Sequence, residues 1–462
     1  VVRASSIRCS LPAGPARGDQ HRTVAHSGRD TAASTLASLR IYAKNEAMFI
    51  ALRHRVFRRL FAAHVVALLG TGLSTIAIGF LVFDTTGGNA AGVLGTLLGI
   101  KMLTFLLLGP LAPLVARRVG TKRLLVLTDL ARVAVALALP FVGDVVTAYL
   151  LIFVLQSASA LFTPTFQATI PAVVSDERQY TGALALSRLA YDIEALVSPS
   201  IASVVVVVAS SSALFFGTGV GFLASALLIL SAALPKASAP VRGVRSVRRE
   251  IAHGTRLMLR VPRLRAVLTL HLALASVGAI AMVLTLPLVL GELDGDEAQA
   301  AALLAVYGVG SITSAVLMPT MIARLGVRPY MMAGLALMIA SMAFVWPVLA
   351  LASGQDALPW LWAIWFLAGL GFSAVLAPMG RVLRDAVPDD DLPDVFAAQF
   401  SLSHGWWLIS YPLAGWGATL IGFGPTSLLL AAFAALALGV AAHAWRTPSL
   451  GEMHPELSAS HQ

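Results

Sequence analysis

A single lysine stands in the middle of a long apolar run. Lys101 is the only charged residue of LLGIKMLTFLLLGP, residues 97–110. In lipid, a cationic side chain far from both surfaces is costly unless it has a partner or a water-filled cavity. Counted from Pro113, Lys101 should lie about 18 Å from the nearest loop, at a rise of 1.5 Å per residue. Lys101 is therefore expected close to the middle of the membrane, where its side chain cannot easily reach either surface.

A second apolar run offers candidate partners for this lysine. The segment SRLAYDIEALVSP, residues 187–199, contains Arg188, Asp192 and Glu194, and we expect its two acids to be the only carboxylates deep in the membrane. Arg188 and Asp192 are four residues apart on a helix and can satisfy each other. Glu194 lies about 200° from Asp192 around the helix, so it has no local partner.

Three interpretations of these four residues remain open. In a structural one, Arg188 and Asp192 form a local pair and Lys101 faces a wet cavity. In a proton-coupling one, Glu194 or Asp192 binds and releases a proton as the cavity opens to either side. In a substrate-binding one, Lys101 receives an anionic group or Glu194 a cationic group, since transporter sites lie near the middle of the membrane.

A polar and aromatic stripe marks another apolar run, FAAQFSLSHGWWLISYPLAGW, residues 396–416. One series at helical spacing begins at Gln399, and another joins His404, Trp407 and Tyr411. Such a stripe predicts either a cavity wall that stacks on a flat organic substrate or helix packing with hydrogen bonds. For Trp416 we expect packing.

Other polar residues in apolar runs have structural interpretations. Asp129 and Arg132, one turn apart, are expected to form a structural pair near one end of their helix. The pair would brace the loop motif that precedes this helix, residues 113–123. His271 is interpreted as a satisfied packing histidine. Four phenylalanines are interpreted as ordinary packing residues, namely Phe105, Phe162, Phe166 and Phe222.

Composition decides which elements hold these residues. Of 462 residues, 58% are hydrophobic and 12% are charged, against about 25% charged in soluble domains. The chain is therefore predicted to be an all-α polytopic membrane protein. Twelve spans of about 20 residues are expected at 60–83, 91–112, 124–142, 145–162, 181–209, 213–234, 266–290, 298–318, 330–351, 359–377, 395–421 and 425–443.

The charge of the connecting loops alternates along the chain. Every second loop carries lysine or arginine, and the loops between them carry only acids such as Asp84, Asp144 and Glu292. The positive-inside rule assigns the basic loops to the cytoplasm. Both chain ends are then cytoplasmic, in a cell (plasma or inner) membrane, and the net charge of +10 needs no nucleic acid to explain it.

Five regions follow from this pattern. Residues 1–47 are expected to be a disordered or mis-assigned extension, since Met48 is the first methionine, and the only cysteine, Cys9, lies in it. Residues 48–234 and 266–446 form two six-helix bundles. Residues 235–265 form a basic cytoplasmic linker, either a solvated segment or a helix on an anionic inner leaflet. Residues 447–462 form a disordered tail.

The two bundles carry an internal repeat. The segment PLVARRVGTKR begins at Pro113, and PTMIARLGVRP begins at Pro319. One common offset pairs Arg118 with Arg324, Gly120 with Gly326 and Lys122 with Arg328. The two halves are therefore expected to be pseudo-symmetric.

These motifs resemble the major facilitator superfamily, whose G-x-L-x-D-R-x-G-R-[RK] loop follows spans two and eight. Stretches such as TDLARVAVAL and TPTFQATIPAVVSDER are similar to its exporter branches of the enterobactin-exporter and macrolide-efflux kind. The resemblance implies two six-helix bundles and gradient-driven transport. The family aspartate is replaced by Arg117 in the first copy and by Ala323 in the second, so its role in locking the cytoplasmic gate cannot be transferred.

A different charge pair can replace it. In the family's fold, the first loop of each half lies beside the last helices of the other half. Arg117 is therefore predicted to pair with the acidic cluster from Asp389 to Asp394, although the latter also suits a helix start. The predicted cytoplasmic gate comprises Arg117, Arg118, Gly120, Lys122, Arg324, Gly326, Arg328, Asp389 and Asp394.

The sequence argues against an enzyme. It has no G-x-x-x-x-G-K-[ST] loop, no His-Glu metal helix and no nucleophile elbow, so we expect no cofactor and no metal. The leading prediction is a monomeric secondary transporter that uses the proton gradient to export a small amphiphilic organic compound. Export of a metal ion, flipping of a lipid-like molecule, and a transport-inactive receptor or scaffold are the alternatives.

Overall fold

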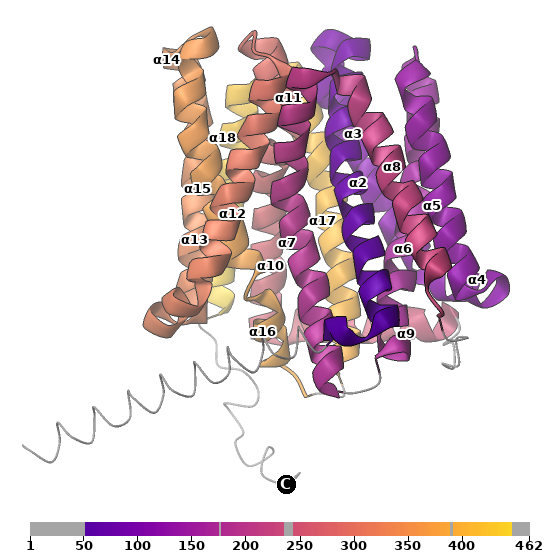
Figure 1. Ribbon diagram of the computed structural model, residues 1–462. Helices are drawn as coiled ribbons and strands as arrows, with labels where there is room; N and C mark the ends of the chain where they lie inside the picture. Colours follow the sequence, from indigo (N-terminus) through magenta and orange to yellow (C-terminus); the bar gives the residue numbers. More distant parts are fainter. Residues whose placement is uncertain (1–50, 175–176, 235–243, 389–390, 446–462) are drawn as a thin grey trace, which may run out of the picture.

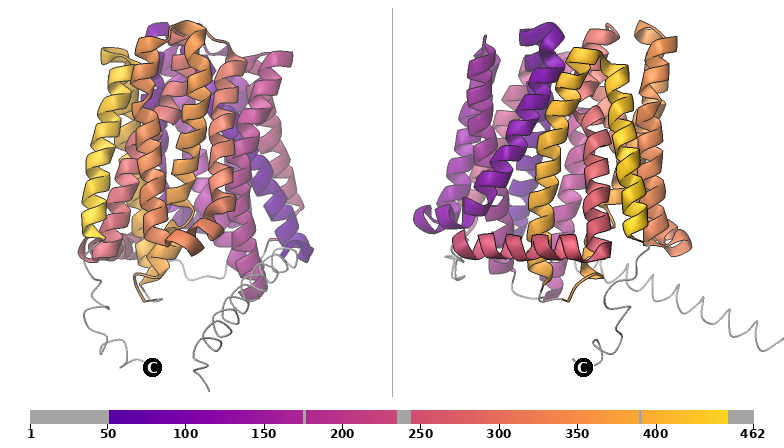
Figure 2. Two further views of the ribbon diagram at one scale, coloured as in Figure 1. Left: turned by 90° about the vertical axis from the view of Figure 1, so that its left-hand side faces the viewer. Right: turned by 180° about the vertical axis from the view of Figure 1, so that it is seen from behind.

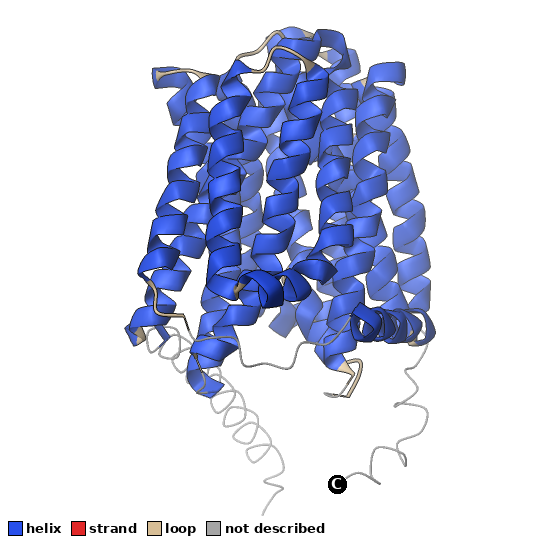
Figure 3. Cartoon of the chain, turned by 90° about the vertical axis from the view of Figure 1, so that its right-hand side faces the viewer, coloured by secondary structure: helices blue, strands red, loops and turns tan. Residues whose placement is uncertain are grey.

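The computed structural model describes residues 51–174, 177–234, 244–388 and 391–445. Within these ranges all regular structure is helical, and the long helices run side by side from one end of the molecule to the other (Figures 1 and 3). The predicted segments 1–47 and 447–462 lie outside the described residues. The all-α prediction is confirmed for the described part.

The first half of the chain begins with seven α-helices. They are α2 (Arg55–Thr86), α3 (Ala90–Leu108), α4 (Ala112–Val119), α5 (Thr121–Ala138), α6 (Val145–Val173), α7 (Glu177–Val208) and α8 (Ser211–Ser231). Three 3-10 turns join or end them, namely η1 (Gly87–Asn89), η2 (Gly109–Leu111) and η3 (Leu139–Phe141).

The second half of the chain is described from Val244 on, where a helix lies in the predicted linker. Its elements are α9 (Val244–Arg260), α10 (Pro262–Ala279), η4 (Ile280–Leu284), α11 (Thr285–Pro287), η5 (Leu288–Glu292), α12 (Glu297–Leu325), α13 (Val327–Ala343), α14 (Val345–Leu351), η6 (Gly354–Ala357), α15 (Leu358–Leu376), α16 (Met379–Arg384), α17 (Leu392–Ile421) and α18 (Phe423–Ala444). The elements η4 and η5 are π-helical.

Nine helical stretches within the described ranges are long and apolar enough to cross a membrane. One of them, Arg55–Leu111, contains both α2 and α3. The chain is therefore a multi-pass membrane protein, and the count of twelve spans stays a prediction.

The two ends of the molecule differ in charge. One end of the molecule carries α9 together with Arg117, Lys122 and Arg324, and we call it the basic end. The opposite end carries Asp144 and Glu292, and we call it the acidic end. In Figure 2 the helix α9 lies across the basic end, at the bottom of the view from behind. It packs against α17 and α10, and His253 lies 3.1 Å from the Asp391 carboxylate.

The internal repeat has a matching structure in both halves. Gly120 and Gly326 adopt φ values of 93° and 85°, a backbone region that favours glycine, and each ends one helix and begins the next. The Lys122 ammonium donates to the carbonyls of Leu230 and Ala232 at the end of α8. Its repeat partner Arg328 donates to the Ala442 carbonyl near the end of α18. Cations stabilise such helix C-termini.

The two halves of the chain meet along two helix pairs, α3 with α17 and α7 with α12. Small residues let the first pair approach closely. A Cβ added at Gly95 would lie 2.5 Å from the Tyr411 carbonyl oxygen, and one at Gly415 would clash with the Ala91 carbonyl. We call this contact, on the half of α3 next to the acidic end, the glycine seam.

Candidate functional site

Lys101 and Glu194 lie close enough to interact electrostatically. Lys101 is half-buried on α3 and Glu194 is half-buried on α7. Among the described side chains, the two make no direct ion pair with each other or with a third group. The two deep charges therefore influence each other without direct contact, whereas their helices pack mainly on other helices, α3 on α17 and α6 and α7 on α12 and α2.

The depth of Lys101 in the membrane stays a prediction. The helix α3 ends at Leu108, because Gly109 and Pro110 turn the chain into η2. Lys101 is thus seven residues, about 10 Å, before the end of α3, and the helical stretch continues through η2 to Leu111.

Glu194 packs against α2. A Cβ at Gly72 would lie 2.5 Å from the Glu194 Oε1 atom, so only glycine fits this position without a shift. One turn along α7, the Ser198 hydroxyl donates to the Leu69 carbonyl at 3.4 Å. Neither Gly72 nor Leu69 was singled out from the sequence. The side chains of Arg188 and Asp192, also on α7, lie outside the described residues, so their predicted pairing stays a prediction.

Lys101 faces α17 across the interface between the halves. Phe105, one turn after Lys101, stacks on the His404 ring with centroids 5.6 Å apart, and His404 interacts electrostatically with Lys101. The His404 Nδ1 atom lies 2.7 Å from the Phe400 carbonyl oxygen. Glu194, Lys101 and His404 therefore form a row of polar groups that crosses from the first half to the second.

Gln399 continues this row toward α10. Its amide lies 3.2 Å from the His271 Nδ1 atom and 3.4 Å from the Met379 sulfur. The His271 Nε2 atom is buried and has no hydrogen-bond partner among the described residues. The prediction of a satisfied packing histidine is therefore only half right.

Trp407 and Tyr411 belong to an aromatic cluster inside the second half. Their rings lie 5.0 Å apart, and Trp407 meets Phe372 edge-on at 6.5 Å. Phe372 also contacts Tyr307 at 5.7 Å, and the Trp407 ring fills the space above Gly278. These contacts favour the packing interpretation for Trp407. Sequence reasoning missed Tyr307 and Phe372, because nothing in their own helices marks them.

Trp416 packs in the glycine seam. Its indole nitrogen donates to the Thr96 hydroxyl at 3.0 Å, and its ring covers Gly92. The interpretation of Trp416 as a packing residue agrees with these contacts.

Asp129 is a buried carboxylate that the sequence interpretation put too close to a helix end. It is fully buried and forms an ion pair with the Arg132 guanidinium. It also accepts a hydrogen bond of 2.8 Å from the Ser225 hydroxyl, which links α5 to α8. The acids of α7 are therefore not the only deep carboxylates. The pair with Arg132 exists, but it braces three helices instead of a loop.

The phenylalanines around this pair are more than ordinary packing residues. Phe162 and Phe222 hold the Arg132 guanidinium between their rings at 4.2 Å and 4.3 Å, a favourable cation–π arrangement. Phe166 stacks on the His64 ring at 4.0 Å. His64 itself is buried, has no hydrogen-bond partner among the described residues and was missed by sequence reasoning.

The predicted gate residues lie at the basic end. Arg117, Arg118 and Arg324 are exposed in the last turns of α4 and α12. Within the described part of the chain, Arg117 forms no ion pair with Asp391 or Asp394, and Asp389 lies outside that part. The pairing of Arg117 with the acidic cluster stays a prediction.

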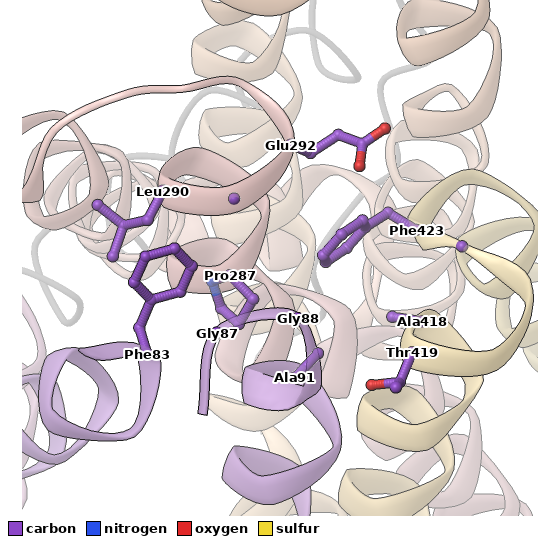
Figure 4. Close-up of a pocket in the computed structure, with 12 residues that line it drawn as sticks. Phe83, Gly87, Gly88, Ala91, Pro287, Leu290, Glu292, Ala418, Thr419 and Phe423 are labelled. Atoms are coloured by element: carbon purple, nitrogen blue, oxygen red, sulfur yellow. The ribbon is translucent and has the colours of Figure 1, made fainter. Parts of the chain in front are cut away.

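A cavity of about 460 Å³ opens at the acidic end. It lies where η1 and the ends of α2 and α17 meet η5, and Phe83, Pro287, Glu292 and Phe423 are among its lining residues (Figure 4). No sequence pattern predicts this cavity, because three separate stretches of the chain, 83–91, 287–292 and 418–423, build it.

Comparisons with known proteins agree with a transporter fold. The family model described as transmembrane secretion effector, of the major facilitator type (MFS_3), matches residues 46–456. A peptide transporter POT solved with sulfate shares 15% identity and a TM-score of 0.64, over 85% of this chain and 95% of that chain. The nucleoside transporter NupG shares 12% identity and a TM-score of 0.66, over 84% and 100%.

A bacterial homologue of the human lysosomal transporter Spinster, in an inward-facing and unoccupied conformation, shares 13% identity and a TM-score of 0.65, over 85% and 96% of the two chains. At these identities the likeness concerns the fold alone. No curated protein sequence matches the chain significantly.

Proposed function

Because the chain belongs to the transmembrane secretion effector family of the major facilitator superfamily, we propose that it is a proton-coupled secondary transporter. It exports a small amphiphilic organic compound by alternating access of one central site to the two sides of the membrane. The narrower likeness to enterobactin exporters and macrolide-efflux proteins is part of this proposal.

The observation that carries the proposal is the juxtaposition of Lys101 and Glu194. The two side chains come from α3 and α7, which are the helices that pack against α17 and α12 of the second half. A relative movement of the two halves therefore changes the electrostatic environment of these charges. A carboxylate inside a membrane protein is by default a functional group, and proton relays use such residues.

The chemistry of the pair supplies a coupling mechanism. When Glu194 is ionised, its charge offsets the Lys101 ammonium. When Glu194 binds a proton, the charge of the Lys101 ammonium is left uncompensated, and a positively charged compound is repelled from the site. Proton binding and substrate binding at the site are therefore linked. His404 on α17, in the opposite half, also interacts with the Lys101 charge.

The closed glycine seam supports access from the basic end. The close contacts of Gly95 and Gly415 lie between Lys101 and the acidic end, so the seam must separate before a compound can leave there. We propose that twelve spans, cytoplasmic chain ends, a monomeric state and a cell-membrane location complete this arrangement. The basic α9 then rests on the anionic inner leaflet.

A proton-flux assay tests the proposal. Purified protein is reconstituted in vesicles with an acidic lumen, amphiphilic compounds are added outside, and the lumenal pH is followed. We expect an active compound to release protons from the lumen, Glu194→Gln to abolish the release, and Lys101→Gln to reduce it at least tenfold. Asp144→Asn, an exposed acid remote from the pair, serves as the matched control and should transport normally.

Two results would overturn the proposal. Proton release that survives in Glu194→Gln would remove the carboxylate from the coupling step. A folded wild-type protein that releases no protons with any compound would favour substrate binding by Lys101 or a transport-inactive scaffold.

A further inference from the structure

The cavity at the acidic end has the chemistry of a binding site. Phe83 and Phe423 lie on opposite sides of it, and Glu292 stands beside Phe423 (Figure 4). Its volume of about 460 Å³ falls in the range of roughly 300–1,000 Å³ typical of small-molecule sites. Aromatic rings and one carboxylate suit a flat or bulky apolar cation, since the faces of aromatic rings attract positive charge.

The wall of the cavity contains one charged residue. Glu292 is exposed at the end of η5, whereas the other lining residues are apolar or small, apart from Thr419. The Thr419 hydroxyl is already engaged, since it donates to the Gly415 carbonyl and accepts from the Gly92 amide. Glu292 is therefore the group that sets the charge preference of the site.

The surroundings of the cavity strengthen this preference. The loops and adjoining helix ends described at the acidic end contain no lysine or arginine. Their acids are Asp84, Asp144, Glu292, Asp294, Asp296, Glu297 and Asp356. A hydrogen bond from the Thr147 backbone amide lowers the pKa of Asp144 below its ordinary value, so that carboxylate is ionised at neutral pH. Clustered charge of one sign raises the local concentration of ions of the opposite sign.

The cavity also lies on the path that the proposed export would use. Ala91 lines it and stands ten residues before Lys101 on the same helix, about 15 Å away. The glycine seam fills the space between these two positions. When the seam separates, the Lys101 region opens into the cavity.

The backbone around Glu292 is unusual for a membrane helix. Two π-helical segments, η4 and η5, follow each other on either side of Pro287, and Glu292 ends the second one. The Leu293 amide accordingly bonds to the Leu288 carbonyl at 3.0 Å. Single π-helical turns inside α-helices occur frequently at functional sites.

We propose that this cavity binds a lipophilic organic cation, with Glu292 as its counter-charge and Phe83 and Phe423 as its aromatic walls. The inference deepens the proposed function. It rests on that function only in one respect, that the bound cation is the exported compound. Binding itself does not depend on proton coupling, so the two can be tested apart.

Equilibrium binding of radiolabelled tetraphenylphosphonium to the full chain in lipid nanodiscs tests the site. Empty nanodiscs supply the background, and tetraphenylborate, of the same shape and opposite charge, should not compete. We expect Glu292→Gln and Phe423→Leu each to raise Kd roughly threefold, and the double variant about tenfold, if the two contacts contribute independently. Asp385→Asn and Phe433→Leu, an exposed acid at the basic end and an exposed ring, both outside the cavity, are the matched controls.

Three results would overturn the inference. They are an absence of saturable binding, equal binding by the double variant, and loss of binding in Glu194→Gln alone, which would move the cation to the central pair. Size-exclusion and melting profiles show that each variant is folded. Normal cation binding without proton release would contradict the proposed function and leave this inference standing.

Discussion

At the scale of single residues, the buried ion pair of α5 carries the clearest stability prediction. Asp129→Asn leaves the Arg132 guanidinium buried without its counter-charge. Breaking one side of a buried pair costs about 3 kcal/mol or more, so thermal unfolding in detergent should begin at a markedly lower temperature. Ser225→Ala removes one hydrogen bond from the same carboxylate and should cost about 1 kcal/mol.

A compensating pair separates charge from shape at this position. Asp129→Leu combined with Arg132→Met removes both charges and keeps apolar volume between Phe162 and Phe222. Apolar replacements of buried ion pairs are often neutral or stabilising, so this double variant should be more stable than Asp129→Asn. Equal melting temperatures for Asp129→Asn and the wild type would show that the pair contributes nothing to stability.

At the scale of helices, the glycine seam between α3 and α17 is the proposed barrier between Lys101 and the acidic end. A valine side chain at Gly415 meets the Ala91 carbonyl, so Gly415→Val must push the two helices apart. The natural sequence has one cysteine, Cys9, which makes a Cys9→Ser, Thr96→Cys background suitable for labelling. We expect Gly415→Val to raise the rate of labelling of this thiol by a membrane-impermeant reagent at least threefold.

The control for this experiment is Gly439→Val on α18. A Cβ at Gly439 meets no atom within 4 Å, so the same substitution should leave the labelling rate unchanged. If Gly415→Val labels no faster than Gly439→Val, the seam is not the barrier at this end.

At the scale of the whole molecule, the order of helices and the internal repeat were predictable from the sequence, because each depends on residues that are neighbours in the chain. Apolar runs mark the helices, and Gly120 and Gly326 mark the same turn twice. The environment of a side chain is not local. Asp129 is deep because α6 and α8 surround it, and Phe105 meets His404 only because α3 packs on α17. The cavity near Glu292, built from three segments, could not be predicted for the same reason.

The orientation of the molecule in the membrane is a property of all its loops together. The basic end carries the lysines and arginines of the described loops, and the acidic end carries none, so the positive-inside rule predicts that the basic end faces the cytoplasm. In a Cys9→Ser background, Asp144→Cys should react with an impermeant thiol reagent added to intact cells. Arg324→Cys, exposed at the basic end, should react only after the cells are permeabilised. The reverse pattern would show that the molecule has the opposite orientation in the membrane. The cavity beside Glu292 would then face the cytoplasm and take up the cation there, instead of releasing it outside.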